Sequence, residues 1–238
     1  MRAIILAAGL GKRMQPLTAT LPKPLLKVGD KSLIEHQIER LVAAGVNGLV
    51  INHFYLGSMI EEVLGNGSRF GIDISYSREA IRLETAGGII KALPQLIDDS
   101  FLVVNADIWT DFDFSTLKPV LDSVDGVDCL AHLVLVENAD HHPHGDFFID
   151  DDGRVHEDHS ASDQRLTFSG ISVMHKNLFH GLPIQPRSHV PLLQKAMVSN
   201  LVSGEAYRGQ WMDIGTPERL QEINKLYADS LTANKAGE

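Results

Sequence analysis

The chain has 238 residues, a length that fits one α/β domain better than a string of independently folded modules. Its 44% hydrophobic and 22% charged residues exclude general disorder. The 21 basic and 31 acidic residues give a net charge of -10, which argues against a nucleic acid or an anionic membrane as partner. The net charge does not argue against a small phosphorylated ligand.

Cysteine content and hydropathy point to one cellular compartment. The chain has 1 cysteine, Cys129, so neither an internal disulfide nor a cysteine-based zinc cluster can form. The apolar run Ala3–Ala8 is too short for a secretory signal, and no other run is long enough to cross a bilayer. We therefore expect a cytoplasmic protein, with monomer or small homo-oligomer left open.

Strands and helices alternate over the first half of the chain. Short apolar runs predict strands, and apolar residues at helical spacing predict helices, the first one capped by Ser32 and Glu35. In chain order we expect a strand over 3–6, a helix over 33–44, a strand over 46–52, a helix over 56–64, a strand over 72–77, a helix over 86–93 and a strand over 101–105. This order predicts a doubly wound, mostly parallel α/β sheet.

The second half has an α+β pattern. Long strands are expected over 129–136 and 166–174, and a hairpin over 147–155 turns at Asp151, Asp152 and Gly153. A helix over 190–197, a strand over 202–207 and a helix over 217–227 follow. We expect a single domain over 1–230, with halves 1–125 and 126–230, and a frayed tail over 231–238.

A glycine loop follows the first strand. In Gly9-Leu10-Gly11-Lys12-Arg13-Met14, glycines at the carboxyl end of a parallel strand can present backbone N–H groups to a phosphate. The dinucleotide fingerprint requires glycine where Met14 stands, and the P-loop pattern is absent. These features disfavour a nicotinamide dehydrogenase and a P-loop ATPase, and a plain surface turn is the alternative to phosphate binding.

Basic residues gather near this loop. Arg13 can hold phosphate oxygens in a fork, and Lys23 lies between Pro22 and Pro24, which restrict the backbone. Residues 1–31 hold 6 basic residues and 1 acid, a charge of +5, so the remaining 15 basic and 30 acidic residues carry -15. The uneven distribution predicts a site for one small polyphosphate near the N-terminus.

Several segments together resemble the sugar-phosphate nucleotidyltransferases over roughly residues 1–227. They are LAAGLGKRM from Leu6, PLT from Pro16, PKPL from Pro22, LETAGG from Leu83, VNAD from Val104, FSGI from Phe168 and WMDIGT from Trp211. The stretches HLVLVENADHHPHGDF and VSGEAYRGQWMDIGTPERL resemble a branch that transfers UMP to a cell-wall sugar 1-phosphate. The resemblance implies a Rossmann-like, GT-A-type sheet with a sugar-binding second half.

The resemblance also implies roles for individual residues. Asp107, just beyond a buried strand, and Asp213 would hold Mg²⁺, the only cofactor implied, although either aspartate alone is more typical of a turn or cap. Lys23, Arg13 and Asp107 are the implied catalytic residues. The implied nucleotide-binding residues, for UTP, are Ala8, Gly9, Gly11, Lys12, Arg13, Lys23 and Glu84. Many relatives have glycine at the position of Glu84.

For the sugar phosphate, the resemblance points to Asn105, Gly145 and Ser169. Larger relatives carry a Glu-Lys-Pro motif where this chain has residues 158–163, DHSASD, so the contact to the acceptor phosphate is unassigned. Arg208 is a candidate for this contact, and an ordinary surface arginine is the alternative. Asp111 and Asp113 are interpreted as a turn and the start of a helix.

Other chemistries fit less well. His141, His142 and His144, with Asp140 and Asp146, could bind a transition metal, but Pro143 interrupts them and a solvated loop is favoured. No G-x-S-x-G elbow supports a serine hydrolase. The remaining alternatives are a guanylyl- or thymidylyltransferase for another sugar 1-phosphate, a cytidylyltransferase for phosphocholine, and a non-catalytic nucleotide sensor.

Overall fold

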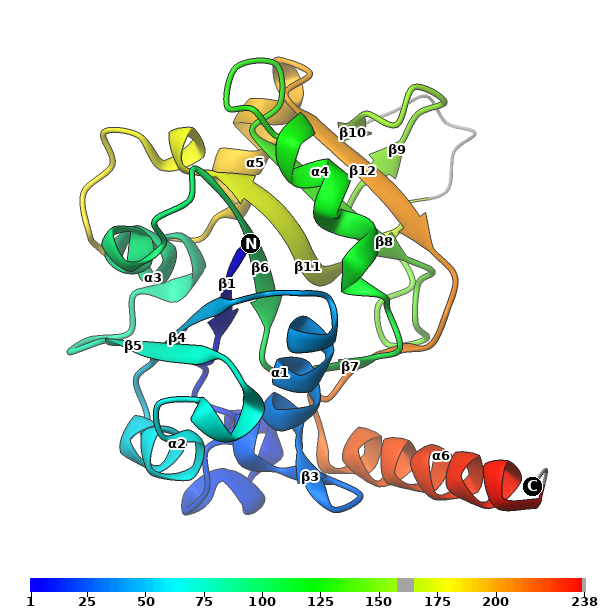
Figure 1. Ribbon diagram of the computed structural model, residues 1–238. Helices are drawn as coiled ribbons and strands as arrows, with labels where there is room; N and C mark the ends of the chain where they lie inside the picture. The colour runs from blue at the N-terminus through cyan, green and yellow to red at the C-terminus, as the bar shows by residue number, and fades with distance from the viewer. Residues whose placement is uncertain (158–164, 237–238) are drawn as a thin grey trace.

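A computed structural model describes residues 1–157 and 165–236, and a seven-stranded sheet organises them (Figure 1). Its order is β12-β8-β11-β6-β1-β4-β5. The strands are β1 (Arg2–Leu6), β4 (Gly48–His53), β5 (Asp73–Arg78), β6 (Ser100–Asn105), β8 (Ala131–Val136), β11 (Thr167–His175) and β12 (Val202–Tyr207). Strand β11 runs antiparallel to β6 and β8, and the other pairs are parallel. The expected mostly parallel sheet is confirmed.

Helices cover both faces of the sheet. On one face lie α1 (Leu33–Ala43), α2 (Gly57–Leu64) and α4 (Lys118–Ser123), and on the other lie α3 (Glu84–Ala92) and α5 (Val190–Val198). The doubly wound arrangement is therefore confirmed, and α4 continues from the helix start that was predicted at Asp113.

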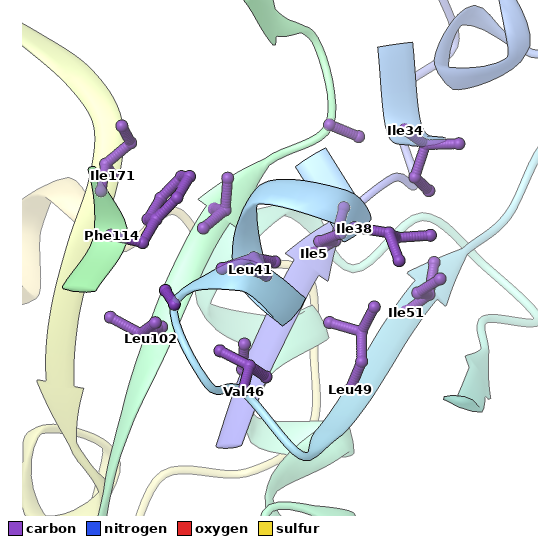
Figure 2. Close-up of a cluster of buried hydrophobic side chains, with 14 of the residues drawn as sticks. Ile5, Ile34, Ile38, Leu41, Val46, Leu49, Ile51, Leu102, Phe114 and Ile171 are labelled. Atoms are coloured by element: carbon purple, nitrogen blue, oxygen red, sulfur yellow. The ribbon is translucent and has the colours of Figure 1, made fainter. Parts of the chain in front are cut away.

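The two faces have separate cores because successive strand residues point to opposite sides. In β1, Ile5 packs on the α1 side and Ile4 on the α3 side, and both are fully buried. Figure 2 shows Ile34, Ile38 and Leu41 of α1 over the first face. The predicted capping box is present, with the Ser32 backbone N–H donating to Glu35 Oε2 over 2.8 Å.

Three short antiparallel pairs lie outside the main sheet. They are β2 (Lys27–Val28) with β3 (Lys31–Ser32), β7 (Ile108–Thr110) with β13 (Trp211–Asp213), and β9 (Phe148–Ile149) with β10 (Val155–His156). The last is the expected hairpin, and its turn is closed by a Gly153 N–H bond to the Asp150 carbonyl. The β7–β13 pair was not predicted.

The last helix, α6 (Pro217–Ala236), extends beyond the expected end at Tyr227, so the backbone of 231–236 is helical. Residues 237 and 238 of the expected frayed tail lie outside the described residues. Asn224 of α6 accepts from the Gly29 N–H over 2.9 Å and donates to the Lys27 carbonyl over 3.1 Å, which ties α6 to the β2–β3 hairpin. Over the described ranges, the structure contains no helix that is both long and apolar enough to span a bilayer.

Candidate functional site

A pocket of about 450 Å³ opens where β1, β4 and β6 end. Its lining comprises Leu6, Ala7, Ala8, Gly9, Lys23, Pro24, Asn52, Arg82, Glu84, Thr85, Asn105, Ala106, Asp107 and Ser188. The carboxyl ends of parallel strands are where α/β sheets bind ligands. Of the residues expected in the site, Ala8, Gly9, Lys23, Glu84, Asn105 and Asp107 lie in this pocket.

The glycine loop forms one wall of the pocket. Gly9 has open space where a Cβ would stand, so a ligand can approach its backbone. Gly11 has a φ of +60°, and a Cβ there would lie 2.9 Å from Thr18 Cγ2. Thr18, which is buried, donates its hydroxyl hydrogen to the Gly11 carbonyl over 2.7 Å. Gly11 therefore shapes the loop without lining the pocket.

Lys12 and Arg13 follow in a 3₁₀ turn that ends at the buried Met14. Both basic side chains are exposed, and neither is among the pocket-lining residues. Met14 packs in a hydrophobic cluster with Trp109, Ile214 of the β13–α6 connection and Ile223 of α6. Through Met14, the loop therefore packs against α6 and the connection that precedes it.

Lys23 lines the pocket, as does one other basic residue, Arg82. It begins a 3₁₀ turn, Lys23–Leu25, preceded by Pro22 in an extended conformation. The residue is only 8% exposed, and its Nζ lies 2.6 Å from Asp107 Oδ2. Asp107 keeps 42% of its side chain exposed. An ammonium and a carboxylate therefore share one point on the pocket wall.

The structure brings Asp213 beside Asp107. Strand β13 pairs with β7 so that Asp213 faces Ile108, and the Ile214 N–H donates to the Asp107 carbonyl over 2.8 Å. Asp213 Oδ1 lies 2.8 Å from His141 Nε2 and also accepts from Arg219 of α6. A Cβ at Gly215 would lie 2.2 Å from Arg219 Nη2, so glycine there leaves room for this contact.

The donor set suits Mg²⁺. Two carboxylates, Asp107 in the turn between β6 and β7 and Asp213 at the end of β13, offer the hard oxygen ligands that this ion prefers. The ion usually takes one or two carboxylates and completes its shell with water and phosphate. Within residues 1–157 and 165–236, no three His, Cys, Asp or Glu side chains gather as a metal site. The residues present fit an ion that is bound together with a triphosphate.

Two histidines of the loop at 141–144 contact separate carboxylates. His141 contacts Asp213, whereas His142 Nε2 lies 3.1 Å from Asp146 Oδ1. The Asp146 Oδ2 atom accepts from the Phe168 N–H over 2.8 Å and so fixes this loop to β11. The imidazoles of His141 and His142 therefore contact different carboxylates.

Only one of the three residues expected to bind the sugar, Asn105, lines the pocket. Ser169 is buried, and its hydroxyl donates to the Val134 carbonyl at a register shift in β11. Gly145 has a φ of +59°, and a Cβ there would lie 2.7 Å from Asn138 Oδ1. Ser169 and Gly145 lie outside the pocket lining, where they shape the neighbouring backbone.

The remaining expectations for this region are also placed. Arg208, which follows β12, is exposed and is not among the pocket-lining residues. Asp113 caps a 3₁₀ turn by accepting from the Ser115 N–H over 2.9 Å, which confirms its interpretation as a helix start. Asp111 accepts from the Gln210 N–H over 2.7 Å. The segment 158–163 lies outside the described residues.

A second segment, around the start of α3, forms another wall of the pocket. The Leu83 carbonyl accepts from the Arg187 N–H over 3.0 Å, and the Arg187 carbonyl accepts from the Ala86 N–H over 2.9 Å. Thr85 Oγ1 accepts from the His189 N–H over 2.9 Å and lies 2.6 Å from His189 Nδ1. Burial lowers the pKa of His189 to about 4, so this imidazole is neutral near pH 7.

Glu84 has a backbone conformation that is unusual for its residue type. Its φ is +59°, in the left-handed region that favours glycine. Its Oε1 atom lies 3.5 Å from Arg82 Nη2, and both residues line the pocket. A strained non-glycine residue at a ligand site is typical of a functional side chain.

Replacing Glu84 with glycine separates the effect of its carboxylate from the effect of its left-handed backbone. Glycine keeps the left-handed backbone and removes the carboxylate, so we expect KM for the nucleotide to rise about tenfold, the effect of one charged hydrogen bond. Asn200, exposed with a φ of +55°, provides the control, and Asn200→Gly should leave KM unchanged. An unchanged KM in Glu84→Gly would mean that the carboxylate does not contribute to nucleotide binding and that only the backbone conformation matters. Initial-rate kinetics measure both.

Comparison with known proteins adds the family context. The chain is 46% identical to an N-acetylmuramate alpha-1-phosphate uridylyltransferase of Neisseria meningitidis over 95% of this chain and 98% of that protein. It is 34% identical to the Caulobacter vibrioides protein of the same name over 91% of this chain and 92% of the relative. The crystal structure of HddC from Yersinia pseudotuberculosis complexed with GMP-PN superimposes with a TM-score of 0.74 and 22% identity, covering 95% of this chain and 99% of that one.

The family model for nucleotidyl transferases matches residues 2–230, which is nearly the whole chain. The matched range includes the glycine loop, Lys23, Asp107 and Asp213. With its sequence matched over this range and its fold shared with a solved structure, the chain belongs to the nucleotidyl transferase family.

Proposed function

We propose that this protein transfers UMP from UTP to N-acetylmuramic acid 1-phosphate, giving UDP-N-acetylmuramic acid and pyrophosphate in peptidoglycan recycling. The observation that carries the proposal is the Lys23–Asp107 ion pair in a pocket beside the glycine loop at the carboxyl edge of the sheet. The backbone around Asp213 lies next to Asp107, and Asp213 itself is outside the pocket lining. The two uridylyltransferase relatives, which cover nearly the whole chain, support the choice of substrates.

The reaction is a substitution at phosphorus. An oxygen of the sugar 1-phosphate attacks the α-phosphorus of UTP, a new P–O bond forms, and the bond to the β-phosphate breaks to release pyrophosphate. The attacking oxygen is already anionic near neutral pH, so no side chain has to accept a proton. The protein contributes by placing the reactants and neutralising charge.

Each part of the site has a task in this reaction. The backbone at Ala8 and Gly9 would hold the departing phosphates, and Lys23 would neutralise the phosphoryl oxygens. Asp107 and Asp213 would hold Mg²⁺, which supplies further charge neutralisation when it is bound. Asp107 is paired with Lys23 in this structure. When the metal and triphosphate bind, Asp107 would contact the metal and Lys23 would contact the phosphates.

A substrate panel tests the proposal. Purified protein is assayed for pyrophosphate release with UTP, GTP, dTTP or CTP, each combined with N-acetylmuramic acid, N-acetylglucosamine, mannose or glucose 1-phosphate, or with phosphocholine. We expect UTP with the muramic acid derivative to exceed every other pair in kcat/KM by at least about tenfold.

The matched pair in this panel is N-acetylmuramic and N-acetylglucosamine 1-phosphate, which differ by the lactyl ether and its carboxylate. Equal kcat/KM for the two would contradict the proposed sugar. A preference for GTP or dTTP would contradict the proposed base but leave the reaction class intact. No pyrophosphate from any pair would favour a non-catalytic nucleotide sensor.

A further inference from the structure

A buried polar bridge connects the two walls of the pocket. Asn52, at the end of β4, is 1% exposed, and both ends of its amide are used. Its Oδ1 accepts from the Ala7 N–H over 2.9 Å, directly before Ala8 and Gly9. Its Nδ2 donates to Glu79 Oε1 over 2.7 Å. Asn52 therefore fixes the backbone at the start of the glycine loop.

Glu79 forms the other end of the bridge. This residue is 7% exposed, and its Oε2 accepts from the Leu83 N–H over 2.8 Å, immediately before Glu84. Burial raises the pKa of the Glu79 carboxyl, so holding a carboxylate here is costly, while the hydrogen bonds from Leu83 and Asn52 favour its charged form. Such a group is expected where it fixes a geometry rather than where it adds stability.

Helix α3 lies in close contact with the Asn52 and Glu79 side chains. A Cβ at Gly88, in the second turn of α3, would lie 2.5 Å from Asn52 Nδ2 and 2.7 Å from Glu79 Oε1. Glycine at this position lets α3 lie directly against the bridge. The helix that carries Glu84 and Thr85 therefore packs against Asn52, which bonds Ala7, and against Glu79, which bonds Leu83.

We propose that Asn52 and Glu79 are positioning residues that set the spacing between the phosphate-binding loop and the turn at Glu84. This inference rests on the proposed function only in that a nucleoside triphosphate binds across both walls. A ligand that contacts both walls senses their spacing, whereas a sugar phosphate placed near Asn105 does not depend on the bridge. Disturbing the bridge should therefore raise KM for the triphosphate selectively.

The pattern of donors and acceptors allows a sharp test. Glu79→Gln replaces one of two accepting oxygens by a donor, so an amide donor faces either the Asn52 amide or the Leu83 N–H. Flipping the Asn52 amide only moves the mismatch to the Ala7 N–H. Asn52→Asp places two carboxylates against each other at pH 8. In the double variant, Asn52→Asp with Glu79→Gln, the introduced amide donates to the introduced carboxylate and accepts from the Leu83 N–H. The introduced carboxylate also accepts from the Ala7 N–H, so all three hydrogen bonds return.

The variants are compared by steady-state kinetics with whichever triphosphate the substrate panel identifies, alongside thermal unfolding. We expect each single change to raise KM for the triphosphate about tenfold, with KM for the sugar phosphate within twofold. The double variant should recover most of the loss. Using the triphosphate chosen by the panel keeps this test valid if the proposed base is wrong.

Glu61→Gln is the control, because Glu61 is a neighbouring carboxylate that bonds His53 and Arg78 outside the pocket. It should leave both KM values unchanged. Three results would overturn the proposal: single variants with an unchanged KM for the triphosphate, single variants that raise both KM values equally, or a double variant as impaired as the single ones.

Discussion

Replacing Lys23 with alanine is expected to lower kcat by about 10²–10³-fold, the effect of removing one preorganised charge from a transition state. Lys23 is the basic side chain that lies both in the pocket lining and beside Asp107, while Lys12 and Arg13 are exposed outside it. Stability should change little, because the partner left behind, Asp107, has 42% of its side chain exposed and can be hydrated. Pyrophosphate release and thermal unfolding measure the two quantities.

Lys27→Ala is the matched control for this prediction. Lys27 is an exposed lysine on the neighbouring hairpin strand β2, outside the pocket. Its replacement removes the same charge from the same region and should leave kcat within about twofold of the original value, because long-range charge effects are screened. If Lys23→Ala and Lys27→Ala had the same small effect, Lys23 would be only one of several loop charges.

Asparagine at Asp107 or Asp213 is expected to lower activity by about 10²-fold or more at ordinary Mg²⁺ concentrations, because each change removes a charged oxygen from the proposed metal site while keeping the side-chain shape. The Mg²⁺ concentration for half-maximal activity should rise in both variants. A second readout does not depend on turnover: Mn²⁺ binding in the presence of the triphosphate, followed by electron paramagnetic resonance, should weaken in both.

Asp113→Asn is the control for the metal prediction. Asp113 lies on the same segment, and asparagine is as good a cap for its 3₁₀ turn as aspartate. Its activity, Mg²⁺ dependence and Mn²⁺ binding should match those of the unmodified protein. Normal Mn²⁺ binding in both Asp107→Asn and Asp213→Asn would remove these residues from the metal site.

Buried strands and amphipathic helices were the predictable part of the fold. Strand β1 and helix α1 appear within a residue or two of their expected positions, because a continuous apolar run and a capped helical repeat are local signals. The β7–β13 pair was missed because three-residue strands carry no periodicity. That pair places Asp213 beside Asp107, so the meeting of these two residues followed from family resemblance and not from local pattern.

The site was predictable in the same uneven way. Lys23, Asp107 and Asn105 were found because they lie in dense motifs or at the end of an apolar strand. Asn52 also ends such a strand, so the same rule could have found it. Arg82 and Ser188 could not have been found, because tertiary contacts of two loops bring them to the pocket. Ser169 shows the opposite case, a motif residue whose hydroxyl bonds within the sheet.

The packing of the glycine loop against α6 has a consequence for synthesis of the protein. Met14 shares its hydrophobic cluster with Ile214 and Ile223, and Asn224, which bonds the β2–β3 hairpin, follows Gly29 by 195 residues. The ribosome therefore makes the loop well before the helix that packs against it. Most of the sheet can pair on a nascent chain, but the glycine loop gains its packing against α6 only once that helix has emerged.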